Sequence, residues 1–371
     1  MRIGLPKEIK NHEYRVGLTP ASVRELSSHG HGVLVQSGAG AAIGLTDAQY
    51  QAAGATLTEH AQDVFANADM VVKVKEPQPQ ECAMLRPGQI LYTYLHLAPD
   101  PEQTAALLRS GAVCIAYETI TGAGGGLPLL APMSEVAGRM AVQAGTAHLE
   151  KSKGGMGVLL GGVPGVPAGH VVILGGGVVG THALQMAVGL GARVTVLDKN
   201  VDRLRQLDLV FGNRISTVYS TSQSVEDAVL DAELVIGGVL IPGAAAPKLV
   251  TRSMISRMKK GAVVVDVAID QGGCFETSHA TTHAEPTFMV DGVVHYCVAN
   301  MPGAVARTST LALNNATIGH AVALANKGWK QALKDNAHLK NGLNVALGHV
   351  TFDAVAQALG YPCVNADTLL G

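Results

Sequence analysis

A glycine-rich segment between two apolar runs, residues 170–198, constrains the fold of this chain more than any other feature. Residues 171–174 are apolar and lead directly into Gly-Gly-Gly-Val-Val-Gly at positions 175–180. A pattern typical of a helix follows, and a second apolar run, residues 194–197, ends at Asp198. This order of strand, glycines, helix, strand and acid is that of a dinucleotide-binding βαβ unit. Glycine is abundant, at 44 of 371 residues, so the prediction depends on the whole order rather than on the glycine spacing alone.

Each of the spaced glycines has its own physical role in such a unit. Gly175 permits the tight turn after the strand, and Gly177 lets the backbone approach a pyrophosphate. Gly180 lets the helix pack closely on the strand, while N–H groups at the start of the helix favour the phosphate charge. Asp198 lies about 20 residues further on, where its carboxylate can accept hydrogen bonds from a ribose 2′-OH. Because an acid at this position favours NAD over NADP, we expect NAD as the cofactor.

Length and composition indicate a globular chain of two or three domains. Apolar residues make up 47% of its 371 residues and charged residues 15%, as in globular rather than disordered proteins. The net charge of -2 gives no reason to expect a nucleic acid or a membrane surface as a partner. The most apolar window, residues 171–190, is broken by glycines, His182 and Gln185, so we expect a buried strand and helix there rather than a membrane span.

Cysteine usage and the first residues favour a cytoplasmic protein. The five cysteines are odd in number and widely spaced, without a CxxC pair, which is typical of reduced thiols. The amino-terminal residues show no basic-then-apolar pattern of a secretory signal. The motifs HExxH and GxSxG and the P-loop pattern do not occur, and the histidines lack metal-ligand spacing, so we expect no metal.

Alternating β-like and helical patterns over the first ~130 residues predict a parallel α/β domain. From residue 308 the chain becomes helical through about residue 326, and two shorter helices are expected after it. The expected strands of this domain cover residues 2–5, 32–36, 70–75, 89–95 and 112–116, and the expected helices cover residues 20–29 and 101–110.

The middle of the chain is expected to extend the dinucleotide-binding unit. A long helix is predicted over residues 134–151, with the side-chain oxygen of Ser134 as its N-cap. The many Gly and Pro residues at positions 154–167 predict a connector. Residues 234–237 and 262–268 predict buried parallel strands.

Together these patterns predict an α/β protein of two domains. Residues 131–305 would form an NAD-binding domain with a Rossmann-type, doubly wound parallel sheet. Residues 1–130 and 306–371 would form a substrate-binding and catalytic domain, a second parallel α/β domain completed by the C-terminal helices.

Polar residues stand where four of the expected strands end, at the edge where parallel α/β sheets bind ligands. Lys75 ends one strand, because Glu-Pro at positions 76–77 cannot continue a central strand, and His96 follows the next. Asp270 follows the strand that begins at residue 262, and Arg15 lies in the loop after the first strand. A lysine, a titratable base, a carboxylate and a fork-shaped cation at one edge would suit a small keto or amino acid.

Each of these residues also has a purely structural alternative. Lys75 could be a solvated strand end, and His96 could hydrogen-bond a turn. Asp270 could cap the glycine-rich loop after it, and Arg15 could form a surface ion pair with the neighbouring Glu13. Only their joint occurrence favours a site.

Seven segments at and around these residues resemble the alanine dehydrogenase family. They are RIGLPKEIK at residues 2–10, EYRVGLTP at 13–20, VKVKEP at 72–77, YLHLA at 94–98, PMSEVAG at 132–138, DVAIDQGG at 266–273 and VANMPG at 298–303. The segments are long, follow one another in the same order and span essentially the whole chain, so the resemblance is specific.

The resemblance implies a role for each strand-end residue. Arg15 would pair with the substrate carboxylate, which a bidentate guanidinium fits better than a lysine. Lys75 would polarise the carbonyl of pyruvate, and His96 would be the general acid and base. Asp270 would position the imine, water or ammonia at the reacting carbon. The pocket would also be lined by Tyr94, Met133 and Asn300.

The resemblance also implies the NAD site and a homohexamer. One departure is His279, which occupies a place where relatives often carry arginine, so no cofactor contact is assigned to it. The implied cofactor-binding residues, with the glycines, are Ser134, Gly175, Gly177, Val178, Val179, Gly180, Asp198, Arg203, Ser220, Val239, Leu240, Val267, Asp270, Val298 and Met301.

The function implied by the resemblance is the reversible NAD-dependent oxidative deamination of L-alanine to pyruvate, ammonium and NADH. The main alternative is the soluble NAD(H)-binding component of a proton-translocating transhydrogenase, which shares the amino-terminal resemblance. Such a protein has little use for an amino-acid site made of Arg15, Lys75 and His96. A saccharopine-forming or lysine-forming dehydrogenase and a catalytically silent NAD sensor are further alternatives.

Overall fold

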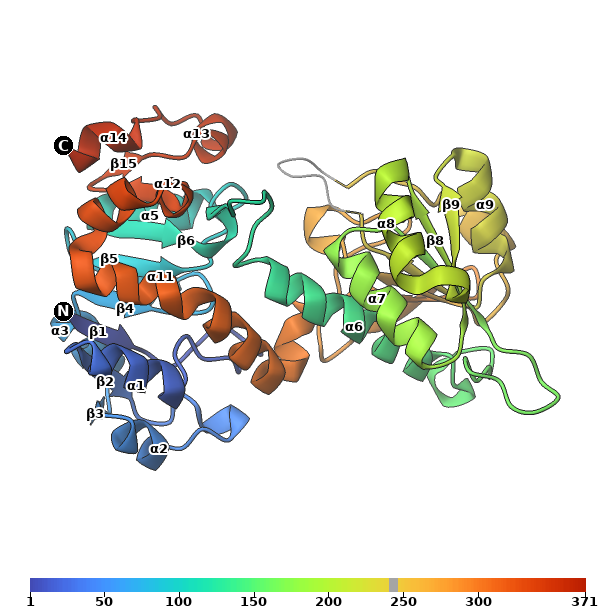
Figure 1. Cartoon of the computed structure of the whole chain (residues 1–371), viewed down its shortest axis with the longest axis horizontal. Coiled ribbons are helices and arrows are strands. Elements are labelled where there is room, and N and C mark those ends of the chain that lie inside the picture. Colours follow the sequence, from blue (N-terminus) through green and yellow to red (C-terminus); the bar gives the residue numbers. More distant parts are fainter. Residues whose placement is uncertain (240–245) are drawn as a thin grey trace. The chain divides into compact units, whose positions relative to one another are not determined.

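Two β-sheets, one in each of two units, organise the chain (Figure 1). The computed structural model describes residues 1–239 and 246–371. The first unit comprises Met1–Met133 and Val305–Gly371, and the second unit comprises Ser134–Ala304. The roles expected for two domains, substrate binding and NAD binding, stay predictions at this point.

The sheet of the first unit contains, within the described residues, eight strands in the order β15-β14-β6-β5-β4-β1-β2-β3. The strands β1 to β6 are parallel to their neighbours. Their bounds are Arg2–Leu5 for β1, Gly32–Gln36 for β2, Ala55–Thr58 for β3, Met70–Val72 for β4, Ile90–Thr93 for β5, Val113–Ala116 for β6, Leu343–Ala346 for β14 and His349–Val350 for β15.

The α/β prediction is confirmed, but one edge of this sheet differs from it. β14 runs antiparallel to β6, and β15 runs antiparallel to β14. The C-terminal segment therefore completes the unit with two strands as well as helices. The helices of this unit are α1 (Pro20–Ser28), α2 (Asp47–Ala52), α3 (Ala61–Asn67), α4 (Pro79–Cys82), α5 (Pro101–Ser110), α11 (Ala306–Asp335), α12 (Ala337–Lys340), α13 (Asp353–Leu359) and α14 (Ala366–Leu370).

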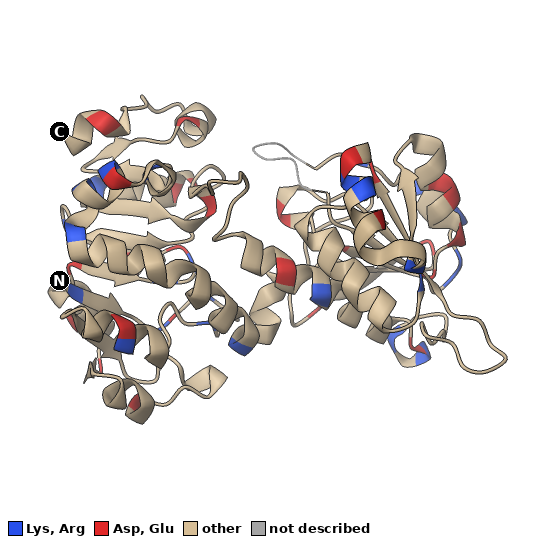
Figure 2. Ribbon diagram, viewed as in Figure 1, with Lys and Arg blue, Asp and Glu red and all other residues tan. Residues whose placement is uncertain are grey.

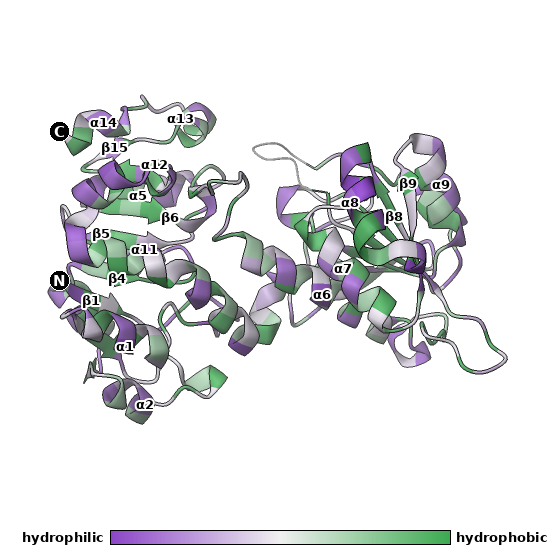
Figure 3. Ribbon diagram, viewed as in Figure 1, coloured by the Kyte–Doolittle hydropathy of each residue, from purple (hydrophilic) through white to green (hydrophobic). Residues whose placement is uncertain are grey.

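Helices cover both faces of this sheet, which explains why its strands are apolar without alternation. Successive side chains of a strand point to opposite faces. Met70 and Ile3 thus pack in a core with α1 and α11, while Val71 and Leu91 pack in a second core with α3 and α5. Figure 1 shows α1 and α11 lying over one face of the sheet, and Figure 3 shows the hydrophobic character of the strands between the helices.

Polar side chains of α11 hold the loop between β1 and α1. The Val16 N–H donates to the Thr310 hydroxyl at 3.2 Å, and the Thr19 N–H donates to Oδ1 of Asn314 at 2.8 Å. The Asn314 amide also donates to the Val16 carbonyl, and it is only 3% exposed. The loop that carries Arg15 is therefore fixed by a helix that the chain forms some 290 residues later.

The second unit contains, among its described residues, seven strands in the order β12-β13-β11-β10-β7-β8-β9. All neighbours are parallel except β12, which is antiparallel to β13. The chain reverses its strand order between β7 and β10, as in a doubly wound dinucleotide-binding sheet. The bounds are His170–Leu174 for β7, Arg193–Asp198 for β8, Ser216–Tyr219 for β9, Leu234–Gly237 for β10, Val263–Asp266 for β11, Thr287–Val290 for β12 and Val293–Tyr296 for β13.

The helices of the second unit pack closely on its sheet. A Cβ on Gly138 would lie 2.2 Å from the Val179 carbonyl oxygen, so α6 and α7 approach as closely as backbones can. Figure 2 shows basic and acidic residues interspersed over both units, in line with the small net charge. The helices are α6 (Ala131–His148), α7 (Val178–Gly189), α8 (Val201–Phe211), α9 (Ser222–Asp231) and α10 (Arg252–Arg257).

The prediction that Ser134 caps the long helix is wrong. α6 begins at Ala131, so Ser134 is already inside its first turn, and the helix ends at His148 rather than at residue 151. Pro132 provides the physical reason, because proline fits the first turn of a helix, where an N–H is not needed.

Gly328 interrupts α11 and provides a stability test. Its φ of 71° and ψ of 159° lie in a region that is almost restricted to glycine. We expect Gly328→Ala to lower the free energy of unfolding by about 1 to 3 kcal/mol. Gly319, in the same helix, has open space around its Cβ position and no such φ, so Gly319→Ala should raise the free energy of unfolding by up to about 1 kcal/mol. Chemical denaturation of both variants checks the pair, and equal effects would contradict this interpretation of Gly328.

Candidate active site

Four of the residues predicted to bind or act on the substrate lie beyond the carboxyl ends of neighbouring strands in the first unit, whereas Met133 lies in α6 and Asp270 and Asn300 lie in the second unit. Arg15 is in the loop after β1, Lys75 follows β4, and Tyr94 and His96 follow β5. These strands are adjacent in the order β5-β4-β1, so their carboxyl ends share one edge of the sheet.

Arg15 forms a buried ion pair with Glu13. Its Nε donates to Glu13 Oε1 at 2.7 Å and its Nη2 donates to Oε2 at 2.5 Å, with side chains only 2% and 1% exposed. The surface ion pair considered as an alternative is therefore present but buried. Nη1 of Arg15 also lies 3.1 Å from the sulfur of Met133.

Charges around this pair shift the pKa of both partners. Burial raises the pKa of Glu13, but hydrogen bonds and charge from Arg15, and the charge of Lys75, outweigh burial and lower it. Burial lowers the pKa of Arg15, but Glu13 again outweighs it and the pKa is raised. Tyr94 also contributes to the raised pKa of Arg15. Glu13, Arg15, Lys75 and Tyr94 therefore share one electrostatic environment.

The rings of Tyr94 and His96 stack, with centroids 5.8 Å apart and planes 11° from parallel. The Tyr94 hydroxyl donates to the Leu129 carbonyl at 2.6 Å. Burial raises the pKa of Tyr94, so this phenol stays neutral and acts as a platform for the imidazole.

Glu118 holds the backbone of His96 in an unusual conformation. His96 has a φ of 50°, and its N–H donates to Oε1 of Glu118 at 2.6 Å. Nδ1 of the imidazole lies 4.0 Å from the same oxygen, and the side chain is 41% exposed. Glu118 was not predicted from the sequence, although it follows β6 and the rule applied to the other strand ends would have found it.

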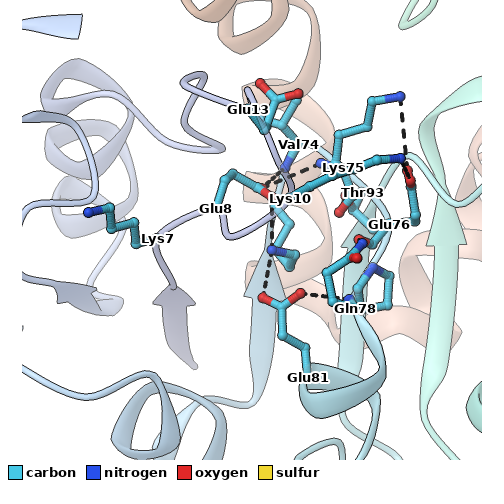
Figure 4. A network of polar contacts seen from close by, with 12 residues as sticks. Lys7, Glu8, Lys10, Glu13, Val74, Lys75, Glu76, Gln78, Glu81 and Thr93 are labelled. Carbon is cyan, nitrogen blue, oxygen red and sulfur yellow. Dashed lines mark hydrogen bonds and ion pairs between the residues drawn. The ribbon is translucent and has the colours of Figure 1, made fainter. Parts of the chain in front are cut away.

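Lys75 is not a solvated strand end. β4 stops at Val72, and the Lys75 side chain is only 15% exposed, with Nζ 4.0 Å from the Glu76 carboxylate. The backbone around it is held by side chains: the Thr93 hydroxyl donates to the Lys75 carbonyl, and Glu8 accepts from the Lys75 N–H (Figure 4).

In the second unit, the glycine-rich loop has the geometry of a dinucleotide turn. Gly175 has a φ of 97°, and a Cβ on Gly180 would lie 1.8 Å from the Gly175 carbonyl oxygen. A Cβ on Gly177 would meet no atom within 4 Å, so the internal packing does not require glycine there. Gly177 is the N-cap of α7 and supplies no side-chain cap, so the start of this helix suits an anion.

Asp198 and Arg203 hold this loop from two sides. Asp198 ends β8, and its carboxylate accepts the Gly176 N–H at 2.7 Å and the Asn200 N–H at 2.8 Å. Nε of Arg203 donates to the Gly176 carbonyl at 2.6 Å. Asp198, from β8, and Arg203, from α8, therefore both contact the glycine turn.

The other predicted cofactor residues lie around the same edge of the second sheet, with Leu240 outside the described residues. Ser220 follows β9, Val239 follows β10 and Val267 follows β11, while Val298 and Met301 follow β13. The remaining ones are Val178 and Val179 in the first turn of α7 and Ser134 in α6.

Asp270 lies beyond β11 in a 3-10 turn, η5 (Ile269–Gln271), and is itself exposed. The alternative that Asp270 caps the following loop is not supported, because Asp266 holds that loop. The buried Asp266 carboxylate accepts from the Cys274 N–H at 2.9 Å and from the Ser278 hydroxyl at 2.6 Å. Burial raises the pKa of Asp266 in spite of these hydrogen bonds.

Asn300 also lies in the second unit, between β13 and a 3-10 turn that begins at Met301, and has a φ of 61°. His279 is exposed and stacks on Phe288, with ring centroids 3.7 Å apart. The structure thus groups Arg15, Lys75, Tyr94, His96 and Met133 in the first unit, while Asp270 and Asn300 belong to the second unit with the cofactor residues.

Comparison with known proteins identifies the family. The models of the alanine dehydrogenase/PNT N-terminal and C-terminal domains match residues 4–137 and 141–353. The chain is 61% identical over 371 residues to an alanine dehydrogenase of Halomonas elongata, with all of both chains covered. It is 57% identical to an alanine dehydrogenase of Bacillus subtilis, with 100% of this chain and 98% of that one covered. The chain belongs to the alanine dehydrogenase family.

Solved structures agree with this family. An L-alanine dehydrogenase structure matches with a TM-score of 0.95 at 53% identity, covering 97% of this chain and 99% of that chain. A transhydrogenase from Sinorhizobium meliloti matches with a TM-score of 0.84 at 26% identity, covering 95% and 100%. The match to the alanine dehydrogenase is closer in both fold and sequence.

Neither a membrane-spanning helix nor a metal-binding cluster occurs in residues 1–239 and 246–371. None of the helices there has the length and apolarity needed to cross a membrane. The same residues contain no group of three or more His, Cys, Asp or Glu side chains arranged to hold a metal ion.

The Glu13–Arg15 pair predicts a pH-dependent loss of stability. Because the pKa of Glu13 is lowered in the folded state, its contribution is complete above its unfolded pKa of about 4.3 and is lost as the pH falls through the folded pKa. We expect Glu13→Gln to lower the free energy of unfolding by about 3 kcal/mol at pH 7 and by progressively less in acid.

Unfolding of wild type and Glu13→Gln, measured from pH 7 down to the lowest pH at which the wild type stays folded, checks this expectation. Glu25→Gln is the control, because Glu25 is 56% exposed in its pair with His29 and should have little effect. A difference between wild type and Glu13→Gln that does not shrink in acid would contradict the proposed pairing.

Proposed function

We propose that the chain catalyses the reversible NAD-dependent oxidative deamination of L-alanine to pyruvate, ammonium and NADH. The observation that carries this proposal is the grouping of buried Arg15 with Lys75 and His96 at adjoining strand ends, in a member of the alanine dehydrogenase family. The lower identity to a transhydrogenase, 26%, disfavours the alternative function.

Arg15 would bind the substrate carboxylate. Glu13 occupies Nε and Nη2 and so fixes the plane of the guanidinium before substrate arrives. Nη1 faces the thioether sulfur of Met133, which is a weak acceptor. A carboxylate is a far stronger acceptor, so the substrate would replace this contact at little cost.

Lys75 would polarise the carbonyl oxygen of pyruvate, and His96 would move the protons. An ammonium directed at an oxygen stabilises the negative charge that develops there during the reaction. NAD, when bound, supplies the acceptor for the hydride from Cα of alanine. His96 would take a proton from the water that adds to this carbon and return a proton to the departing amine, with Asp270 positioning the water.

The second unit supports a nicotinamide dinucleotide as the cofactor. The open space at Gly177 and the start of α7 suit a pyrophosphate, and Asp198 suits a ribose diol. Arg203 would lie near the adenosine. The other residues proposed to hold NAD are Ser134, Gly175, Val178, Val179, Gly180, Ser220, Val239, Leu240, Val267, Asp270, Val298 and Met301.

On this proposal the first unit binds the substrate and carries Arg15, Lys75, Tyr94, His96 and Met133, and the second unit binds NAD and carries Asp270 and Asn300. The family resemblance further supports a homohexamer in the cytoplasm.

One assay tests the proposed reaction. Purified protein mixed with NAD⁺ and L-alanine, without any membrane, should produce NADH, and omission of alanine should abolish the signal. An absence of NADH with alanine, together with hydride exchange between nucleotides when membranes are added, would favour the transhydrogenase function instead.

The role of His96 predicts a selective loss of turnover. His96→Ala should lower kcat by about 10² to 10⁴ because a general acid and base contributes a factor of that size. NADH affinity, measured by nucleotide fluorescence, should stay within about twofold because His96 lies in the other unit. His60→Ala, at an exposed position before α3, is the control and should keep full turnover. Normal turnover by His96→Ala would refute the assignment.

The role of Asp198 predicts a change in cofactor preference. A charged hydrogen bond to the ribose contributes about 1.5 to 3 kcal/mol, so Asp198→Ala should reduce the preference for NAD over NADP by at least about tenfold. Arg203, at the same glycine turn, would then face the 2′-phosphate. The ratio of kcat/KM for NAD and NADP checks this, with the exposed Asp202→Ala as control. An unchanged ratio in Asp198→Ala would contradict the role of this carboxylate.

A further inference from the structure

A fully buried lysine between two buried carboxylates lies next to the segment that carries Lys75. Lys73 directly follows β4, and its side chain is 0% exposed. Its Nζ donates to Oε2 of Glu8 at 3.0 Å and to Oε1 of Glu81 at 2.8 Å. The two carboxylates are themselves only 3% and 2% exposed (Figure 4). We refer to Glu8, Lys73 and Glu81 as the buried triad.

Stability alone does not account for such a triad. Transfer of charges from water into a protein is costly, and apolar replacements of buried ion pairs are often neutral or stabilising. Burial lowers the pKa of Lys73, but the charges of Glu8 and Glu81 outweigh it and raise the pKa. The ammonium of Lys73 therefore stays charged inside the first unit. An apolar residue in its place would leave the carboxylates of Glu8 and Glu81 buried without a cation.

The carboxylates of the buried triad instead accept hydrogen bonds from backbone N–H groups of residues 74–78. Oε1 of Glu8 accepts the Val74 N–H at 2.6 Å and the Lys75 N–H at 3.4 Å. Oε2 of Glu81 accepts the Gln78 N–H at 2.8 Å. The two carboxylates thus fix both ends of residues 74–78, and Lys73 joins the carboxylates to each other.

Regular structure supports this segment only at its start, where the Lys73 N–H donates to the Tyr92 carbonyl at 3.1 Å and the Tyr94 N–H donates to the Val74 carbonyl at 3.3 Å. β4 ends at Val72 and α4 begins at Pro79, so residues 73–78 lie in neither strand nor helix. The same segment reaches the stacked rings, because the Tyr117 hydroxyl donates to the Lys73 carbonyl at 3.0 Å and the Tyr117 ring packs edge-on against Tyr94.

We propose that Glu8, Lys73 and Glu81 are positioning residues for Lys75, which they hold where its ammonium can meet the carbonyl oxygen of the substrate. This inference deepens the proposed function and rests on it. None of the three touches the substrate; they act through the backbone of Lys75. A displacement of about 1 Å at a reacting group can reduce a rate by 10²-fold, so a small shift of this segment has a large effect.

Glu8→Gln tests the inference. The amide oxygen can still accept the Val74 N–H, but the amide nitrogen then faces Nζ of Lys73, and since both groups are donors this hydrogen bond is lost and the segment must shift. We expect kcat/KM for pyruvate to fall by at least about tenfold, while the KM for NADH stays within about twofold. If Glu8 only stabilised the fold, kcat/KM for pyruvate and the KM for NADH would change together.

Asp69→Asn is the matched control. Asp69 immediately precedes the same strand, β4, and its carboxylate accepts the Arg2 N–H at 2.7 Å. It therefore makes the same kind of bond at the end of the strand opposite to Lys75, and should leave kcat/KM for pyruvate unchanged.

A double-mutant cycle decides whether the effect passes through Lys75. In a Lys75→Ala background, with residual activity measured at high enzyme concentration, Glu8→Gln should change kcat/KM less than twofold. An equal loss in both backgrounds would overturn the inference, and so would wild-type kinetics of Glu8→Gln. Glu81→Gln is measured in parallel and should behave in the same way, so a folding defect in one variant does not prevent the test. If the wild type itself forms no NADH from alanine, it is the proposed function that fails, before the cycle begins.

Discussion

Hydrogen bonds from backbone N–H groups beyond the strand ends to side-chain carboxylates stabilise loops in both units of this protein. Beyond the parallel strands only some backbone groups still bond to a neighbouring strand, and an unpaired buried N–H costs about 1 to 3 kcal/mol. Glu8, Glu118, Asp198 and Asp266 each satisfy such N–H groups, at the ends of β4, β5, β7 and β11. Each of these carboxylates supports a loop that carries a residue proposed for substrate or cofactor.

The carboxylates also set the electrostatics of the first unit. Arg15, Lys73 and Lys75 bring three cations to one edge of the sheet, and Glu13 and Glu8 lie among them. On the proposed function, a substrate carboxylate would meet Arg15 and Lys75, whose positions are already fixed by their neighbours. Binding then requires little rearrangement of the protein, which is how a preorganised site saves free energy at the moment of reaction.

The parts that could be predicted from the sequence are those that depend on local order. The glycines of residues 175–180, between two apolar runs, predicted β7, α7 and β8 because each feature lies within a short stretch of chain. The strand-end rule predicted Arg15 and His96 as site residues because parallel strands share one edge. The supporting carboxylates Glu8 and Asp266 were missed, since their partners are set by tertiary contacts rather than by any spacing.

Other differences have the same origin. β14 is short and pairs antiparallel with β6, more than 200 residues earlier, so no local pattern marks it, and β15, which pairs with β14, is only two residues long. Ser134 was predicted to cap the long helix, but α6 begins at Ala131, with Pro132 in its first turn. The roles of the individual site residues stay predictions, because they concern molecules that the chain alone does not contain.

The first unit is built from two separate stretches of the sequence, which affects the order in which the two units can fold during synthesis. The second unit is one continuous stretch, Ser134–Ala304, whereas the first unit needs Val305–Gly371 for α11 and for two strands of its sheet. Because domains generally fold as they leave the ribosome, the second unit can fold while the first unit still lacks β14 and β15 at one edge of its sheet. The loop of Arg15 also has to wait, because Thr310 and Asn314, which hold it, follow the second unit in the chain. A nascent chain would thus acquire its cofactor fold before it could recognise an amino acid.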